Sequence, residues 1–363
     1  MATRWFRAVF TIGKCLTITP PYDSRMSLSQ KIYTSVLVTT ITTLVVMSII
    51  KKRGYQGYTY DKVTVNLILD FILSTFCSYT PLSIALWKEQ QWENLMQNLR
   101  SILFTNKNTK KILRHVKICF AKMATNLVIL ILIYSFWANH FGPFYYSQRY
   151  GILYIELLLV YSFNTFLSLI LNVLLTQYQY LNHQLDEQMG SKVVFTQKLV
   201  HSLKDIEQSL YFLKDTIEIV NSAFGWPLVL SISFTILHIL NKFHFMFIIL
   251  LFPDEGVLQR IIADAVSVLL TFYYTVTVIV SCDLVLKEAE EMLLKSYKLK
   301  RKTEHVSAND RKELKRFSNA IVQNFPKFSA ARFFDIDRST ILSILGTVIT
   351  FFIIMVQFQD CSK

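Results

Sequence analysis

The strongest constraint on this chain is a series of long apolar stretches in which charged side chains are rare or absent. The last of them lies between Arg338 and Asp360, which enclose 21 uncharged residues. An α-helix rises 1.5 Å per residue, so about 20 residues cross the apolar core of a bilayer. Hydrophobic residues make up 52% of the chain, and its mean hydropathy is +0.36. Soluble domains rarely contain several such stretches, so the sequence predicts a polytopic membrane protein.

Seven stretches are long enough to span a membrane, and the predicted fold class is all-α with seven transmembrane helices. They cover residues 32–50, 63–87, 123–141, 152–175, a run within 223–252, 261–286 and 338–360. We expect four parts along the chain: a cytosolic N-terminal tail (1–31), the first six spans with their helical extensions (32–286), a cytosolic anchor segment (287–337) and a terminal helix (338–363).

The lysines and arginines are divided unevenly between the segments on the two sides of the predicted membrane. Of the 38, 29 fall in segments on the side of the N-terminus and seven in segments on the other side. Cytosolic segments of membrane proteins carry the excess of basic residues. The sequence therefore predicts a cytosolic N-terminus and an extracellular C-terminus, the reverse of a rhodopsin-like receptor.

Two apolar stripes lie outside the predicted spans, in the long inner segments. Their spacings of three and four residues are typical of helices with one packed face. Such a face needs a partner surface, so we expect the membrane helices to continue into the cytosol and pack there as a helical domain. The first stripe is Leu199, Leu203, Ile206, Leu210, Leu213, Ile217 and Val220, and the second is Leu314, Phe317, Ile321 and Phe328.

The terminal stretch carries a polar stripe along one face. Such a stripe either hydrogen-bonds to neighbouring helices or lines water inside the membrane, and the spacing by itself favours the first use. The residues follow one another at intervals of three or four: Thr340, Ser343, Thr347, Thr350, Ile354 and Gln357.

A short motif closes the same stretch, namely Thr350 and Phe351, five apolar residues, and then Gln357 and Phe358. It resembles the signature of the insect gustatory receptor family, which has Thr-Tyr, five hydrophobic residues and Gln-Phe. Phe351 departs from the pattern, because a tyrosine is usual there. The preceding run 328–337 is similar to the cytosolic lead-in of the family's last helix. The resemblance is closest over about the last forty residues and rests upstream on the number of spans.

The resemblance implies that the chain is a subunit of a ligand-gated cation channel. In similar receptors four copies of the last helix surround a central pore, and cytosolic helices join the subunits. A ring of phenyl groups can close such a pore by dewetting, and amides can solvate a passing cation. The pore and gate residues implied for this chain are Thr347, Thr350, Ile354, Gln357 and Phe358.

Ionisable and aromatic residues inside the spans mark a candidate ligand site, because charges in a bilayer are costly. They gather in the outer half of the predicted helices, which favours an aromatic-lined pocket that opens outward. Alternatively, Lys242 pairs with Glu156 or Asp264 and only joins helices. Trp137 also suits an interfacial aromatic belt. The candidate ligand-binding residues are Asp70, Trp137, His140, Glu156, His238, Lys242, Asp264, Tyr273 and Tyr274.

The sequence lacks the common motifs of catalysis and metal binding. It has no Gly-x-Ser-x-Gly, no phosphate loop and no His-Glu-x-x-His, and its five cysteines do not have metal-ligand spacing. We therefore expect no enzymatic activity, no cofactor and no metal. The net charge of +13 does not indicate a nucleic-acid partner, because the basic residues are divided among alternate loops. The basic run 295–302 is typical of a solvated helix face.

Together, the sequence and the resemblance predict a tastant-gated, non-selective cation channel in the plasma membrane of chemosensory neurons. The expected partners are a small-molecule tastant, membrane lipid, and either copies of the chain in a homotetramer or related receptors in a heteromer. Three alternatives stay open. An odorant receptor subunit has similar topology, a G-protein-coupled receptor has the opposite orientation, and a transporter is suggested by the charges within the spans.

Overall fold

The computed structural model describes residues 2–21, 26–53, 60–105, 109–190, 197–251, 256–302 and 308–360. Nearly all of these residues are helical, so the all-α prediction is confirmed. In chain order the elements are α1 (Ala2–Cys15), α2 (Leu28–Arg53), α3 (Tyr60–Leu82), the π-helical turn η1 (Ser83–Trp87), α4 (Glu89–Thr105), α5 (Thr109–Phe141), α6 (Pro143–Gly190), α7 (Gln197–Leu251), α8 (Val257–Lys302), α9 (Ala308–Gln323), β1 (Ser329–Ala330), β2 (Phe334–Asp335) and α10 (Arg338–Asp360).

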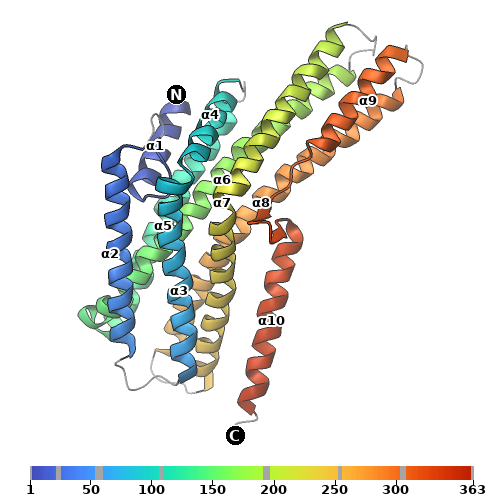
Figure 1. The fold of residues 1–363 in the computed structure, drawn as a ribbon. Helices are drawn as coiled ribbons and strands as arrows, with labels where there is room; N and C mark the ends of the chain where they lie inside the picture. Colours follow the sequence, from blue (N-terminus) through green and yellow to red (C-terminus); the bar gives the residue numbers. More distant parts are fainter. Residues whose placement is uncertain are drawn as a thin grey trace.

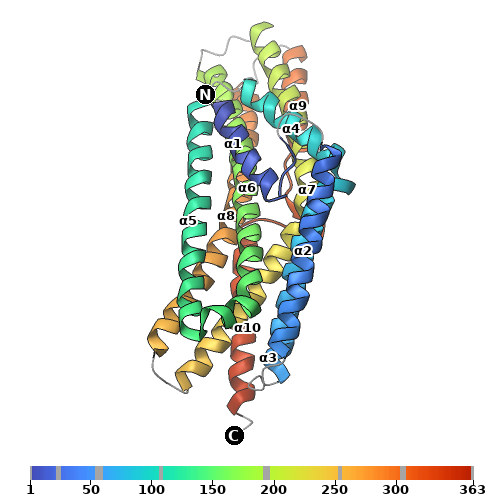
Figure 2. The same ribbon diagram turned by 90° about the vertical axis from the view of Figure 1, so that its left-hand side faces the viewer.

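The helices form an elongated bundle, in which α2, α3 and α10 are close to upright in Figure 1 and α6 runs obliquely toward the upper right (Figures 1 and 2). The three longest, α6, α7 and α8, contain 48, 55 and 46 residues. At 1.5 Å per residue each is roughly 70–80 Å long, which is more than twice the thickness of a bilayer's apolar core. Their ends therefore project past α2 and α3, where α9 packs beside them (Figure 1). We call these projecting ends, together with α9, the arm.

The described part of the chain contains seven helices that suit a membrane, as the sequence predicts. Six of them, α2, α3, α5, α6, α7 and α8, are long and apolar enough to cross it. The seventh, α10, is 23 residues long and apolar over Arg338–Ile354. The two termini lie at opposite ends of the bundle (Figure 1). An odd number of crossings produces this arrangement, and the charge distribution then predicts that the N-terminus and the arm are cytosolic.

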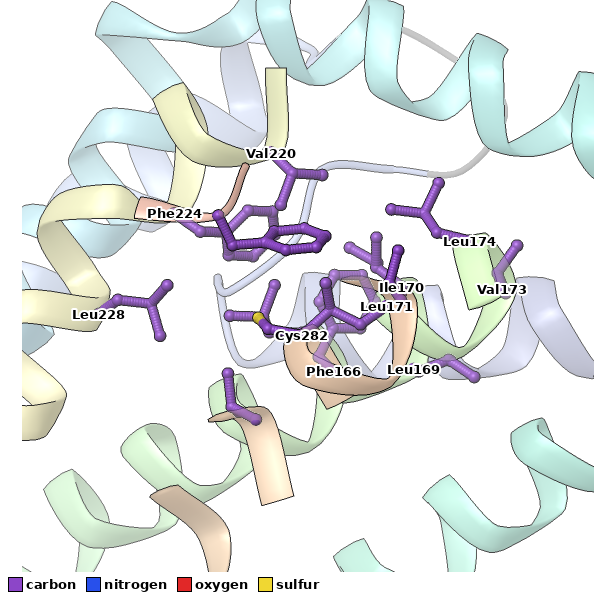
Figure 3. Close-up of a cluster of buried hydrophobic side chains, with 14 of the residues drawn as sticks. Phe166, Leu169, Ile170, Leu171, Val173, Leu174, Val220, Phe224, Leu228 and Cys282 are labelled. Carbon is purple, nitrogen blue, oxygen red and sulfur yellow. The ribbon is translucent and has the colours of Figure 1, made fainter. Parts of the chain in front are cut away.

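Helix α6 lies at the centre of the bundle. Within its most apolar window 89% of the residues are buried inside the chain, whereas the figure is 28% for α2 and for α5. Figure 3 shows part of this core, in which Phe166 and Ile170 of α6 gather with Val220 and Phe224 of α7 and with Cys282 of α8. The outer helices present most of their side chains to the surroundings, as expected for lipid-facing spans.

The segment predicted as an N-terminal tail contains helix α1. Its buried face includes Phe6 and Phe10, and the ring of Phe10 packs edge-on against Phe166 at 4.8 Å. The hydroxyl of Tyr33 on α2 donates to the carbonyl of Cys15 at 3.0 Å. Helix α1 is therefore part of the bundle, packed mainly against α5.

The predicted packing stripes are buried: α7, which carries the first, contacts α4 and α9, and α9, which carries most of the second, contacts α7 and α8. Leu199 belongs to the stripe, but its side chain lies outside the part that the structure describes. Ion pairs hold the surface of the arm together, with Lys295 2.6 Å from Asp186 and 3.0 Å from Glu291. The buried stripe residues are Leu203, Ile206, Leu210, Leu213, Ile217, Val220, Leu314, Phe317, Ile321 and Phe328.

A short β-hairpin joins the arm to α10. β1 and β2 are antiparallel, with Ser329 opposite Asp335 and Ala330 opposite Phe334. The turn residues Ala331 and Arg332 have φ angles of 49° and 64°, in the left-handed region that side-chain-bearing residues avoid. Contacts with α7, described below, hold this turn in place.

Helix α10 begins with a reciprocal cap. Oδ1 of Asp337 accepts hydrogen bonds from the backbone N–H of Ser339 at 2.8 Å and from its hydroxyl at 2.5 Å, while Oγ1 of Thr340 accepts from the N–H of Asp337 at 3.3 Å. The bonds from Ser339 lower the pKa of the Asp337 carboxyl below its usual 3.8. The cap is therefore fully formed above that value and is lost as the pH falls through the lower, folded-state pKa.

We predict that Asp337→Ala frays the first turn of α10. Losing an N-cap costs about 1 kcal/mol, so amide hydrogens of residues 339–341 should exchange about fivefold faster, as measured by mass spectrometry. Asp337→Asn keeps the acceptor without the titration, so its protection should not decrease between pH 5 and pH 3, whereas that of the native chain should. Equal protection in all three proteins at pH 5 contradicts the assignment of the cap.

Candidate functional site

A cavity of about 350 Å³ lies at the end of the bundle away from the arm. Its walls come from the last turn of α2, the beginning of α3, the end of α5, the beginning of α6, the second half of α7 and the beginning of α8. By the predicted orientation this is the extracellular half. The volume is at the lower end of the range for sites that hold small organic molecules.

Aromatic rings from α5 and α6 form one wall of the cavity. Trp137 stacks on Phe141 at 5.7 Å, Phe141 on Tyr146 at 6.2 Å, and Tyr146 on Tyr150 at 5.0 Å. The two helices meet closely because Gly142 turns the chain between them with a φ of 90°, which favours glycine. The result is a continuous aromatic surface suited to a flat or apolar ligand.

The wall from α2 and α3 carries a closed ion pair. Nζ of Lys52 lies 3.0 and 2.8 Å from the two carboxylate oxygens of Asp70, and 5.0 Å from the ring centroid of Tyr150. The pair is largely shielded from solvent, so removing either side chain would leave the other charge buried without a partner. Charge from this wall is therefore balanced within the protein.

The wall from α7 and α8 carries most of the remaining polar groups. Nζ of Lys242 lies 2.6 Å from Oδ1 of Asp264, whose side chain is fully buried. One turn before Lys242, Nε2 of His238 lies 3.1 Å from the hydroxyl of Ser267. Lys242 has three N–H donors and lines the cavity, so it can offer a hydrogen bond to a ligand while it neutralises Asp264.

The structure brings four of the nine candidate ligand residues together in the cavity wall: Asp70, Trp137, His238 and Lys242. Asp264 lies behind the wall as the partner of Lys242, so the ion pair weighed from the sequence is present. The other four do not line this cavity. His140 is an exposed neighbour of Trp137, Glu156 is buried, Tyr273 is half-exposed, and Tyr274 donates to the carbonyl of Lys122.

Several cavity residues escaped the sequence analysis. Three tyrosines of α6, Tyr146, Tyr150 and Tyr154, follow at intervals of four and share one helix face. That spacing was a usable signal. Lys52 and Asn66 gave no such signal, because they lie at the ends of spans where polar residues are ordinary.

The candidate pore helix α10 packs along one face only. Thr340, Ile344 and Val348 are buried against α7 and α8, and Phe352 lies 6.0 Å from the ring of Phe243. The polar stripe lies beside this buried face and is largely uncovered: Ser343, Thr350, Ile354 and Gln357 are exposed and Thr347 is half-buried. The side chain of Phe358 lies outside the described part of the structure.

The other uncovered face of α10 is apolar, with exposed Leu342, Leu345, Ile349 and Ile353. A polar stripe facing lipid leaves acceptors without partners, which is unfavourable in the apolar core of a bilayer. The helix therefore has one face for its own chain, one suited to lipid or to another apolar surface, and one suited to water or polar groups.

The fold and the cavity together define a multi-pass membrane receptor with a small-molecule-sized site in one half of its helices. The family model for 7tm chemosensory receptors matches residues 6–360, and the chain belongs to that family. It is therefore a receptor rather than an enzyme, as the missing catalytic motifs suggested. No curated protein sequence gives a significant match.

Solved structures share the fold, among them two of an insect olfactory receptor. One is the insect olfactory receptor OR5 from Machilis hrabei, with a TM-score of 0.71, 13% identity and 98% of each chain covered. The other is the same receptor in complex with eugenol, with a TM-score of 0.70, 15% identity, and 98% of this chain and 99% of that chain covered. At such low identity the likeness shows the fold, which agrees with the predicted seven-helix architecture.

The Lys242–Asp264 pair leads to a stability prediction. Lys242→Met strands a fully buried carboxylate and should lower the free energy of unfolding by about 3–5 kcal/mol, measured by denaturation in mixed micelles. The double variant Lys242→Met, Asp264→Leu should regain most of this loss, because both charges are removed. Arg316→Met, which breaks the more exposed pair with Glu207, is a matched control that should cost less than about 1 kcal/mol. A double variant as unstable as Lys242→Met contradicts the assignment of the pair.

Proposed function

We propose that the chain is a subunit of a ligand-gated cation channel whose pore is lined by α10. The observation that carries this proposal is the polar stripe of α10, which is exposed at Ser343, Thr350, Ile354 and Gln357 in the described part of the chain. Four copies arranged around an axis would bring their stripes together around water and leave the apolar faces to lipid and neighbouring helices. This arrangement removes the exposed polar groups from lipid without any change to the fold.

The gate belongs at the end of α10 nearest the C-terminus. Gln357 and Phe358 occupy the positions of the Gln-Phe motif, and Ile354 and Thr350 lie one and two turns before Gln357 on the same stripe. Rings of phenyl groups dewet a narrow pore, whereas hydroxyl and amide groups replace part of a cation's hydration. We assign Phe358 to the closed constriction and Thr347, Thr350, Ile354 and Gln357 to the pore wall.

The ligand that we propose is a small molecule bound in the cavity, and the structurally similar receptor OR5 has been solved in complex with a small molecule, eugenol. The aromatic wall and the donor of Lys242 suit a compact molecule with an apolar body and a hydrogen-bond acceptor. The Gln-Phe motif favours a tastant and a gustatory role. An odorant suits the same cavity, so an odorant receptor subunit is the second candidate. In either role the channel belongs in the plasma membrane of chemosensory neurons.

The cavity and the pore helix are connected through α7. Phe234, His238 and Lys242 of α7 line the cavity, and the same helix holds the hairpin that precedes α10. Nδ2 of Asn221 donates to the carbonyl of Lys327 at 2.6 Å, and its Oδ1 accepts from the N–H of Ser329 at 3.2 Å. A shift of α7 on ligand binding therefore moves the beginning of α10.

Gly225 allows the closest approach in this connection. A Cβ atom at Gly225 would lie 2.7 Å from the backbone nitrogen of Ala331 and 2.9 Å from its Cα, distances that real atoms do not adopt. Trp226 adds an edge-on contact with Phe333 at 5.4 Å. At the other end of the hairpin, Nε of Arg338 lies 2.5 Å from Asp283 of α8. The hairpin is thus fixed to two helices of the bundle.

The most direct test of the proposed function is a planar bilayer that contains only the purified chain. Cation currents with discrete unitary steps should appear when a ligand from a panel of sugars, bitter alkaloids and volatile phenols is added. The active class distinguishes a gustatory from an odorant role. Saturable flux without unitary steps indicates a transporter, and a response in cells that stops when G-protein signalling is blocked indicates a G-protein-coupled receptor.

We predict that Phe358→Ala leaves the pore partly open without ligand. Removing the phenyl ring eliminates the apolar constriction, so baseline conductance should rise about tenfold or more. Phe358→Leu keeps an apolar side chain and should stay closed. Normal closure of the alanine variant, with surface expression equal to that of the native chain, excludes Phe358 as the gate.

A second prediction concerns coupling. Gly225→Ala forces the hairpin away from α7, so about tenfold more ligand should be needed for half-maximal current, while ligand binding to the cavity changes little. Gly151→Ala is the matched control, since a Cβ there meets only Ser147 at 4.0 Å and the change should be neutral. Equal currents in both variants contradict the assigned role of the hairpin.

A further inference from the structure

Helix α5 carries a basic face just before it enters the membrane. Lys110, Arg114 and Lys117 follow at intervals of four and three residues, so they lie on one side of the helix, and all three are exposed. Within the described residues none of the three takes part in an ion pair. We call these three residues the basic stripe of α5.

The two helices that form this surface contribute no carboxylates to it, and the nearby Glu288 of α8 is bonded to Gln179 of α6. Helices α1 and α5 together hold eight lysines and arginines and no aspartate or glutamate. The other helices on this side differ, because α4, α6, α7, α8 and α9 all carry acidic residues. Some basic residues there are paired with carboxylates, as Lys295 is with Asp186 and Arg316 with Glu207. The surface where α1 packs on α5 carries its positive charge without an acidic residue on either helix.

The position of the basic stripe matches the headgroup layer of a membrane. Further along α5, toward the middle of the predicted membrane, the same helix face carries exposed apolar residues, among them Val128 and Leu132. The basic side chains therefore lie next to side chains that suit contact with lipid tails. Between these two groups of residues in the sequence is Lys122, whose Nζ lies 5.1 Å from the ring centroid of half-exposed Tyr273. Lysines near the ends of membrane helices often extend their charged group toward the interface in this way.

Helix α1 widens this surface and adds an aromatic anchor. Trp5 is 41% exposed and packs edge-on against Phe120 of α5 at 5.7 Å. Half-exposed tryptophan is typical of the interface between headgroups and tails, where its ring is apolar and its N–H finds a polar partner. Ile118, on another side of α5, is also exposed. The surface therefore combines uncompensated positive charge with apolar side chains that reach into lipid.

We propose that the basic stripe of α5, together with Trp5 and Lys122, is a binding site for anionic phospholipids in the leaflet on the N-terminal side. Phosphate and carboxylate groups of the headgroup bind to Lys110, Arg114 and Lys117, and the acyl chains lie along the exposed apolar face of α5. The predicted orientation makes this the cytoplasmic leaflet, which is the one rich in anionic lipid. An alternative is that these basic residues only orient the chain during membrane insertion. That role would not require them to lie on the same helix face as exposed apolar residues.

The test uses the full chain in nanodiscs of phosphatidylcholine with one-fifth phosphatidylserine. Native mass spectrometry counts the phosphatidylserine molecules that stay bound after gentle extraction. Each basic residue near an anionic surface contributes about a factor of five in affinity, so the triple variant Lys110→Gln, Arg114→Gln, Lys117→Gln should bind the lipid at least tenfold more weakly. Higher ionic strength should weaken binding to the native chain and have less effect on the variant.

Three controls make the result decisive. The first control is a triple variant of the arm, Lys298→Gln, Lys300→Gln, Arg301→Gln, which removes the same charge and should leave lipid retention unchanged. The second is the double variant Lys110→Arg, Lys117→Arg, which keeps the charge and should retain lipid as the native chain does. Soluble glycerophosphoserine should not displace the lipid, because it lacks acyl chains. The proposal is overturned if both triple variants lose bound lipid equally, if the α5 triple variant retains lipid fully, or if the soluble headgroup displaces the lipid. Preferential binding of an acidic peptide also overturns it, because it would indicate a protein partner.

Discussion

The structure depends on hydrogen bonds between side chains of α6, α7 and α8 inside the membrane. Asn164 of α6 donates to Ser231 of α7 at 3.0 Å, and Thr235 of α7 lies 2.7 Å from Thr275 of α8. Apolar contacts gain little when the surroundings are also apolar, so small polar residues and close packing hold membrane helices together. In the arm Asn182 continues the pattern with a 2.9 Å bond to Glu288. The three helices thus connect the cavity to the arm as one unit.

Helix α10 contrasts with this unit, because it touches α7 and α8 along one narrow face. Its other attachments are the ion pair of Arg338 with Asp283 and the hairpin held by Asn221. A channel needs a rigid frame that carries the ligand site and an element whose position can change at low cost. Ligand binding shifts an equilibrium only through a difference in affinity between two arrangements. In the mechanism that we propose, the cavity lies on the unit formed by α6, α7 and α8, and the hairpin transmits a shift of α7 to α10.

The sequence allowed the seven spans, the helical arm and its buried stripes to be predicted, because each depends on spacing along one helix. The N-terminal helix was missed, although Phe6, Val9 and Phe10 have helical spacing. The residues that line the cavity were harder to predict, because they come from six helices. Trp137 and Lys242 were predicted from their chemistry, whereas the pairing of Lys52 with Asp70 depends on how α2 and α3 pack. Spacing within one helix does not contain that information.

We propose above that the polar stripe of α10 lines an ion pathway. Single cysteines along this helix, with a charged thiol reagent applied from the extracellular side during ligand activation, test it most directly. Current should be blocked at Ser343, Thr347, Thr350 and Gln357 and stay unchanged at Leu345, Ile349 and Ile353, which lie on the apolar face. Block at the apolar positions, or at none of the polar ones, would exclude a water-lined stripe and assign it to contacts between helices.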